Sequence, residues 1–213
     1  MIKNNVKNIL SELPRDVELE VATKKRDISQ ILEVIAAGVR IVGENYVQEA
    51  QSKFDVLGRK VKWHLIGHLQ KNKAKTAVKI FDMIETLDSV ELAAALDKEC
   101  KKINKVMPVL IEVNSACESQ KAGVLPENVK DLVAEILGFK NLNFMGLMTM
   151  GPSVDNPEDI RSFFKVTKDI FDRIKQTNAD CKYLSMGMSD TYKVAYQEGA
   201  NIVRVGTAIF GSR

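Results

Sequence analysis

Lys24 lies near the carboxyl end of the strand segment VELEVATKK. A lysine in this place is suited to act as an amine nucleophile toward carbonyl groups. Alternate side chains of an extended strand face opposite sides, so Lys24 shares one face with Glu20 and Ala22. Leu19 and Val21 take the other face and are expected to contact a helical layer. In a partly desolvated pocket, the pKa of a lysine falls and its neutral amine becomes available. The segment therefore offers a lysine for covalent carbonyl chemistry.

The same segment has a simpler interpretation. Lys24, Lys25 and Arg26 are three consecutive basic residues, and such runs are usually solvated turns. On this segment alone the solvated turn is the more common case. The residues near the end of the chain change that balance.

The segment NIVRVGTAIFG places an arginine, Arg204, on the inward face of a late strand. A buried arginine is costly unless it is paired or hydrogen-bonded. The residues that follow, Gly206 and Thr207, begin a short turn whose backbone N–H groups suit a phosphate. The preceding loop, LSMGMSD, adds hydroxyl groups, although Ser189 or Asp190 would equally serve as a helix cap. Together the two segments predict a phosphate site.

Two further strand ends are unusually polar. Asn45 lies in GENYVQE and His64 lies in WHLIGHLQKNK, and either side chain is suited to hydrogen-bond a ligand ring or the lysine imine. A histidine on a strand is, however, more often a satisfied core residue. Glu112 is expected to face inward from a later strand, where it would pair with a buried base such as Arg204 or Lys24.

The elements that position these residues alternate between short β-branched strands and amphipathic helices, which is the pattern of βα units. Eight such strands predict a single (β/α)8 TIM barrel that spans residues 1–213, with its chemistry at the carboxyl ends of the strands. A doubly wound open sheet is the alternative, but no glycine-rich fingerprint follows the first strand. The predicted strands are Val17–Thr23, Val39–Val42, Val61–Ile66, Met83–Thr86, Val106–Asn114, Leu142–Met150, Tyr183–Ser185 and Asn201–Val205.

Composition indicates an ordinary globular protein. Of the 213 residues, 45% are hydrophobic and 28% charged, and the net charge of +3 does not point to nucleic acid or an anionic membrane. The first residues do not resemble a secretory signal, and no apolar run suits a membrane span. Three cysteines without CxxC spacing and only two histidines make a disulfide framework or a metal site improbable. We expect a cytoplasmic protein without a metal.

Several motifs together resemble one family. GENYVQE, WHLIGHLQKNK, MGLMTM, LSMGMSD and VRVGTAIFG are similar, in this order, to the YggS/PROSC family of pyridoxal 5′-phosphate (PLP) homeostasis proteins. The resemblance covers the chain from about Val17 to Arg213 and implies a fold like the alanine racemase N-terminal barrel. It also implies that Lys24 holds PLP as a Schiff base. Thr23 replaces the serine of the family motif, and Lys25 remains a rival for the cofactor lysine.

The resemblance also implies roles for the last two strands. Ser185, Ser189, Gly206 and Thr207 would contact the phosphate of PLP, and Arg204 would lie near the pyridine nitrogen. A cation in that place disfavours protonation of the ring, and a neutral ring is a weaker electron sink. This suits a racemase, and it also suits a protein that only holds the cofactor.

The implied function is buffering or delivery of PLP to acceptor enzymes, by a monomer without enzymatic turnover. A slow amino-acid racemase is the alternative. Alanine racemase uses a second base, a tyrosine from a separate domain of its partner subunit, and we expect no such domain after Arg213. A cofactor-free lysine aldolase would also use Lys24, but it leaves the motifs unexplained. Lys121 is either a secondary cofactor contact or a solvated loop lysine.

Overall fold

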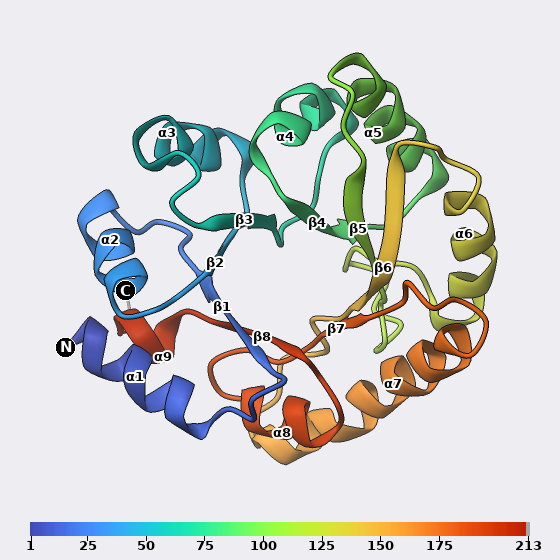
Figure 1. The fold of residues 1–213 in the computed structure, drawn as a ribbon. Helices are drawn as coiled ribbons and strands as arrows, with labels where there is room; N and C mark the ends of the chain where they lie inside the picture. Colours follow the sequence, from blue (N-terminus) through green and yellow to red (C-terminus); the bar gives the residue numbers. More distant parts are fainter. Residues whose placement is uncertain (212–213) are drawn as a thin grey trace.

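Eight parallel strands close into a barrel in the order β1 to β8, with β1 hydrogen-bonded to β8 (Figure 1). The structure is a computed structural model and describes residues 1–211. All eight predicted strands are present, with ends that differ by at most two residues, so the TIM barrel is confirmed and the open sheet is excluded. The strands are β1 (Glu18–Ala22), β2 (Ile41–Glu44), β3 (Lys62–Leu65), β4 (Met83–Leu87), β5 (Met107–Glu112), β6 (Leu142–Met148), β7 (Tyr183–Ser185) and β8 (Ile202–Val205).

Helices surround the barrel, as in Figure 1. Local signals set their ends: Asp27 and Gln30 form a capping box at the start of α2, and Pro126 and Pro157 open short 3-10 turns before α6 and α7. The α-helices are α1 (Ile2–Glu12), α2 (Ile28–Ala36), α3 (Val47–Leu57), α4 (Ala74–Ile80), α5 (Val90–Lys102), α6 (Val129–Ile136), α7 (Arg161–Lys175), α8 (Tyr192–Gln197) and α9 (Thr207–Phe210). The 3-10 helices are η1 (Lys71–Lys73), η2 (Pro126–Asn128) and η3 (Pro157–Ile160).

The strands separate an apolar layer from a polar lumen. Val203 and Val205 belong to the apolar core, whereas Arg204 between them bonds to groups on other strands. The same alternation places Val21 in that core and Glu20 in the lumen, where it meets a histidine of β3. The strand parity predicted from the sequence is therefore confirmed on both sides of the β1–β8 junction.

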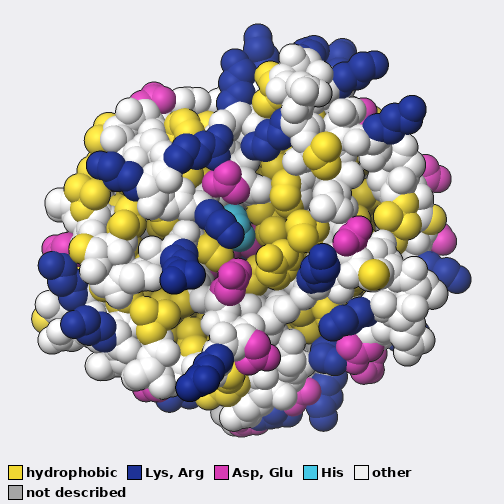
Figure 2. All heavy atoms as spheres, viewed as in Figure 1, with side chains coloured by type: hydrophobic (Ala, Val, Ile, Leu, Met, Phe, Trp, Pro, Cys, Tyr) yellow, Lys and Arg dark blue, Asp and Glu magenta, His cyan; other side chains and the backbone are white. Residues whose placement is uncertain are grey.

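The surface carries charges of both signs. Lys and Arg side chains lie around the rim of the face in Figure 2 and also near its centre, with Asp and Glu side chains among them. Within residues 1–211, no helix has the length and apolar character required to cross a membrane.

Candidate functional site

A cavity of about 330 Å³ opens where β1, β2, β7 and β8 end. Six of the eight residues predicted for the site line it, and they come from segments far apart in the sequence. This volume is in the range of small-ligand pockets. The six are Lys24, Asn45, Ser189, Arg204, Gly206 and Thr207.

Lys24 follows β1 by two residues and is half-buried at the cavity wall. Its Nζ lies 5.3 Å from the centre of the Tyr46 ring, a cation–π distance. Lys25, the rival on sequence grounds, is exposed and does not line this cavity. The geometry therefore favours Lys24 over Lys25 as the nucleophile.

Arg204 reaches the cavity from β8 although it is only 2% exposed. Its Nη1 donates to Ser185 Oγ at 2.5 Å and its Nη2 donates to the Thr149 carbonyl oxygen at 2.8 Å. These bonds fix the plane of the guanidinium group. Because a guanidinium has only donors, Arg204 can face only an acceptor on any ligand in the cavity.

Ser185 lies behind Arg204 and does not line the cavity. It is fully buried, and its hydroxyl donates to Glu85 Oε2 at 2.7 Å while accepting from Arg204. Both hydrogen-bonding directions are therefore used inside the protein. A direct phosphate contact, which the sequence suggested, has no support from this geometry, and Ser185 instead holds the arginine.

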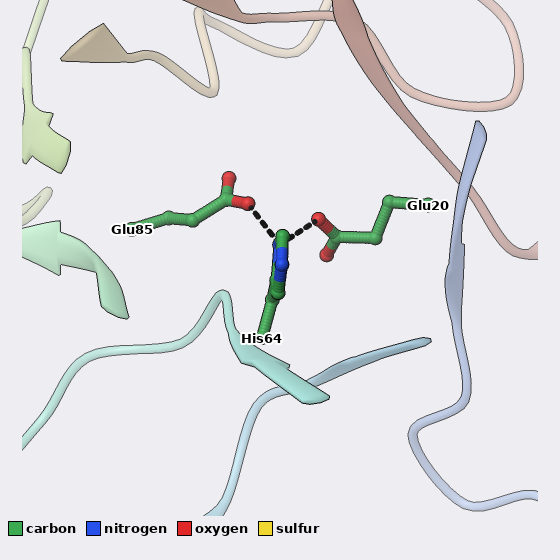
Figure 3. Close-up of side chains that lie close together, drawn as sticks. All are labelled: Glu20, His64 and Glu85. Carbon is green, nitrogen blue, oxygen red and sulfur yellow. Dashed lines mark hydrogen bonds and ion pairs between the residues drawn. The ribbon is translucent and has the colours of Figure 1, made fainter. Parts of the chain in front are cut away.

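His64 also lies below the cavity rather than in its wall. Its Nδ1 is 3.1 Å from Glu20 Oε2 and 2.8 Å from Glu85 Oε1, so three strands meet at this nitrogen (Figure 3). With 3% of its surface exposed, it is a satisfied core histidine, the more common of the two roles considered for it. Ligand contact by His64 is thus not supported. A series of contacts therefore runs from Glu20 through His64, Glu85 and Ser185 to Arg204.

The charge states within this chain follow from burial and from the neighbours. Burial and the charge of Glu85 raise the pKa of Glu20 to about 8. Burial lowers the pKa of His64, but bonds and charges from both glutamates outweigh it and raise that pKa to about 10. Burial favours the acid form of Glu85, yet His64 outweighs it and lowers its pKa to about 2. At neutral pH the triad thus holds a carboxylic acid, an imidazolium and a carboxylate.

These shifts predict how the stability of the ligand-free protein depends on pH. His64, with its pKa raised from 6.5, stabilises the fold fully below pH 6.5, and this contribution is lost as pH rises toward 10. Glu20, raised from 4.5, acts in the same direction and loses its contribution between pH 4.5 and 8. Glu85, lowered from 4.5, loses its contribution only as pH falls from 4.5 toward 2. Each proton changes the free energy of unfolding by up to about 1.4 kcal/mol per pH unit.

We expect urea midpoints of the wild type to fall from pH 6 to pH 9. Glu20→Gln replaces a carboxylic acid by its neutral isostere, so this variant should fold and show a flatter decline. An identical decline in Glu20→Gln and wild type would contradict the assignment of a proton to Glu20.

Ser189 lies in the wall of the cavity and bonds to the first turn of α9. Its Oγ accepts from the backbone N–H groups of Gly206 and Ala208, at 3.2 Å each. Thr207, between them, is exposed and lines the cavity. Both backbone N–H groups thus donate to Ser189 in this structure, and the two hydroxyl groups beside them, of Ser189 and Thr207, are donors of the kind that suits an anion.

A second cavity, of about 340 Å³, adjoins the first and shares Met150 and Met188 with it. Glu112 lines it, and burial raises the pKa of this carboxyl to about 7. Its Oε2 has no hydrogen-bond partner. Arg204 lowers the pKa of Glu112 through its charge, but no hydrogen bond or ion pair joins the two in the described chain, so direct pairing with Arg204 is not seen. Pairing with Lys24 stays a prediction. Lys121 lines this second cavity and not the first.

Sequence reasoning missed the positions of Glu85 and Thr149, which support the site from β4 and from the end of β6. A carboxylate within the otherwise apolar strand segment MIETL was the available signal for Glu85. Thr149 acts through its backbone carbonyl, which carries no signal in residue type.

Comparisons with known proteins identify the family of the chain. A family model described as the alanine racemase N-terminal domain matches residues 1–213. The pyridoxal phosphate homeostasis protein of Aquifex aeolicus is 42% identical over 185 residues, which cover 86% of this chain and 81% of that protein. The corresponding protein of Pasteurella multocida is 34% identical and covers 100% of this chain and 94% of its own.

Solved structures show the same fold. PipY of Synechococcus elongatus, in a structure with PLP bound, has a TM-score of 0.90 and 31% identity, covering 99% of this chain and 100% of that one. An alanine racemase of Clostridium difficile has a TM-score of 0.84 at 16% identity and covers 100% of this chain and 58% of its own, a likeness of fold alone. The chain belongs to the alanine racemase N-terminal domain family and, within it, to the pyridoxal phosphate homeostasis proteins.

Proposed function

We propose that this protein binds PLP in the cavity beside Lys24 and holds it as a Schiff base on that lysine. The observation that carries the proposal is the convergence of one amine, one buried guanidinium and a turn with two hydroxyl groups on a single cavity of about 330 Å³. Relatives named for PLP homeostasis, and a PLP-bound structure of PipY, support the choice of ligand.

The residues present fit each part of PLP. Lys24 supplies the amine for the aldehyde, and Arg204 supplies a donor for the pyridine nitrogen. Ser189 and Thr207 would supply hydroxyl donors for the phosphate, beside the backbone N–H of Gly206. When bound, PLP provides an electrophilic aldehyde carbon and a ring that withdraws electrons. The chain itself binds, orients and covers these groups.

Arg204 would determine how strongly the pyridine ring of bound PLP withdraws electrons. Held by Ser185 and Thr149, it would offer the ring nitrogen a hydrogen-bond donor and no proton acceptor. A ring nitrogen that accepts from Arg204 stays unprotonated, which weakens the ring as an electron sink. This favours holding the cofactor over demanding carbanion chemistry.

The role that follows is homeostasis of PLP in the cytoplasm. A protein that binds the aldehyde reversibly would limit its free concentration and pass it to PLP-dependent enzymes. We propose that it acts as a monomer and without turnover. Titration of the purified protein with PLP tests the proposed binding and Schiff base. One equivalent of PLP should bind and give a yellow absorption band, and the absence of such a band would reject the proposal.

A slow amino-acid racemase is the second candidate. The likeness of the barrel to alanine racemases is the reason to keep it, together with a phenol next to the lysine, since Tyr46 lies beside Lys24 Nζ. Incubation of L-alanine with the PLP-loaded protein, followed by chiral chromatography, separates the candidates. Formation of D-alanine that is lost in Tyr46→Phe would favour the racemase, and no D-alanine would favour the binding protein.

The phosphate end gives a specific prediction. Ser189→Ala removes a hydroxyl beside the two backbone donors, and a hydrogen bond to a charged group is worth about 1.5–3 kcal/mol. We therefore expect the Kd for PLP to rise at least about 10-fold. Pyridoxal, which lacks the phosphate, is the matched ligand, and its Kd should stay unchanged. An equal rise in the Kd for PLP and for pyridoxal would mean that the phosphate does not bind beside Ser189.

A further inference from the structure

The backbone on both sides of Lys24 is held by one buried group of side chains. Its centre is Lys53 of α3, with Glu44 at the end of β2, Glu49 of α3 and Thr23 of the β1–α2 loop. We call these four residues the Lys53 cluster. None of them lines the cavity beside Lys24.

Lys53 is saturated by its neighbours. Only 6% of the residue is exposed, and its Nζ lies 2.6 Å from Glu44 Oε1 and 2.7 Å from Glu49 Oε1. It also donates to the carbonyl oxygen of Thr23 at 2.7 Å. An ammonium has three donors, and all three are used here. Such full pairing is what a buried cation requires.

The cluster binds the chain directly before and directly after Lys24. Before it, the Thr23 carbonyl accepts from Lys53 and the Thr23 hydroxyl donates to Glu44 Oε1 at 2.6 Å. After it, the backbone N–H of Lys25 donates to Glu49 Oε1. Lys25 has φ +58°, in the left-handed region that a lysine rarely adopts. The Glu49 contact stabilises this conformation, which turns the chain sharply after Lys24.

We propose that Lys53, with Glu44 and Glu49, positions the amine of Lys24 for covalent capture of the PLP aldehyde. This rests on the function proposed above. The cluster acts through the backbone: it fixes where the Lys24 side chain leaves the β1–α2 loop. A displacement of about 1 Å at a reacting group lowers its reactivity on the order of 100-fold.

The ring and phosphate of the ligand would be bound from other elements. Arg204 comes from β8 and is held by Ser185 and Thr149, and Ser189 lies after β7. None of these residues contacts the Lys53 cluster in the hydrogen bonds and ion pairs of the described chain. Loss of the cluster should therefore weaken the covalent step and leave non-covalent binding intact.

Two ligands separate those steps. PLP carries the aldehyde, whereas pyridoxine 5′-phosphate has an alcohol in its place and cannot form an imine. In Lys53→Met, we expect the Kd for PLP to rise about 10-fold to 100-fold, and that for pyridoxine 5′-phosphate to change by less than about twofold. Glu49→Ala should shift in the same direction, and it is the milder variant because Glu49 is partly exposed.

Lys105→Met is the matched control. Lys105 is a half-buried lysine whose ammonium donates to two backbone carbonyls, those of Val78 and Phe81, in another part of the barrel. Lys105→Met should leave the Kd for PLP and for pyridoxine 5′-phosphate unchanged.

Equal weakening of both ligands in Lys53→Met and Glu49→Ala would overturn the inference, because that is the signature of a general structural role. An unchanged Kd for PLP in both variants would overturn it as well.

If wild type binds pyridoxine 5′-phosphate but never captures PLP, the proposed function fails by itself. The positioning role is then decided without cofactor, by labelling with acetic anhydride and mass spectrometry. Altered acetylation of Lys24 in Glu49→Ala, with Lys71 unchanged, supports positioning, and identical acetylation rejects it.

Discussion

Lys24→Ala should abolish covalent attachment of PLP while leaving a weak, colourless complex. Lys24 is the lysine that lines the cavity with Arg204 and the phosphate-binding turn, so its removal deletes the imine and spares the remaining contacts. We expect the Kd for PLP to rise about 100-fold, which corresponds to about 2.7 kcal/mol, and the yellow band to be absent. Titration followed by absorbance, with equilibrium dialysis for the weak complex, measures both.

Lys25→Ala is the control for this variant. Lys25 has the same charge and is the next residue, but its side chain is exposed and does not line the cavity. Its loss should leave the band in place. If the band persisted in Lys24→Ala and disappeared in Lys25→Ala, Lys25 would be the lysine that forms the imine. That result would refute the strand parity argument.

Glu85→Ala should be the most destabilising single change in the lumen. Glu85 accepts from Ser185 and pairs with His64, and the charge of Arg204 lies near it. Removing one partner of a buried ion pair costs about 3–5 kcal/mol. Here Glu20 remains 3.1 Å from His64, so the loss falls mainly on the charge of Arg204 and on the hydroxyl of Ser185. For a chain of this length we expect Tm to fall by about 10 °C. Differential scanning calorimetry of the ligand-free protein checks this.

Glu112→Gln is the matched control, since Glu112 is likewise a buried lumen glutamate. Its Oε2 has no partner and burial has raised its pKa to about 7, so loss of its charge should leave Tm unchanged or raise it. If Glu85→Ala and Glu112→Gln had equal effects, the pairing of Glu85 would not be the source of its importance.

The barrel could be predicted from the sequence because short β-branched or apolar runs alternate along the chain with amphipathic helices. It also predicted which side of β1 and β8 would face inward, since period-two alternation needs no tertiary information. That alternation, together with the predicted barrel, in which the first and last strands are neighbours, is what assigned Lys24 and Arg204 to one site.

The supporting contacts could not be predicted in this way. Whether His64 contacts a ligand or two glutamates depends on how β1, β3 and β4 are staggered, and alternation within one strand does not determine that register. The contacts of Ser185 with Glu85 and Arg204 likewise depend on register between strands. Lys53 gave no signal because a lysine on an amphipathic helix is normally solvated.

The central claim is that Lys24 carries the cofactor. The most direct test is borohydride reduction of the PLP-loaded wild type, followed by proteolysis and mass spectrometry of the labelled peptide. Borohydride converts an imine into a stable secondary amine, so the label stays on the lysine that formed it. The account predicts one phosphopyridoxyl group per chain, on Lys24. A label on Lys25 or Lys121, or none at all, would contradict it.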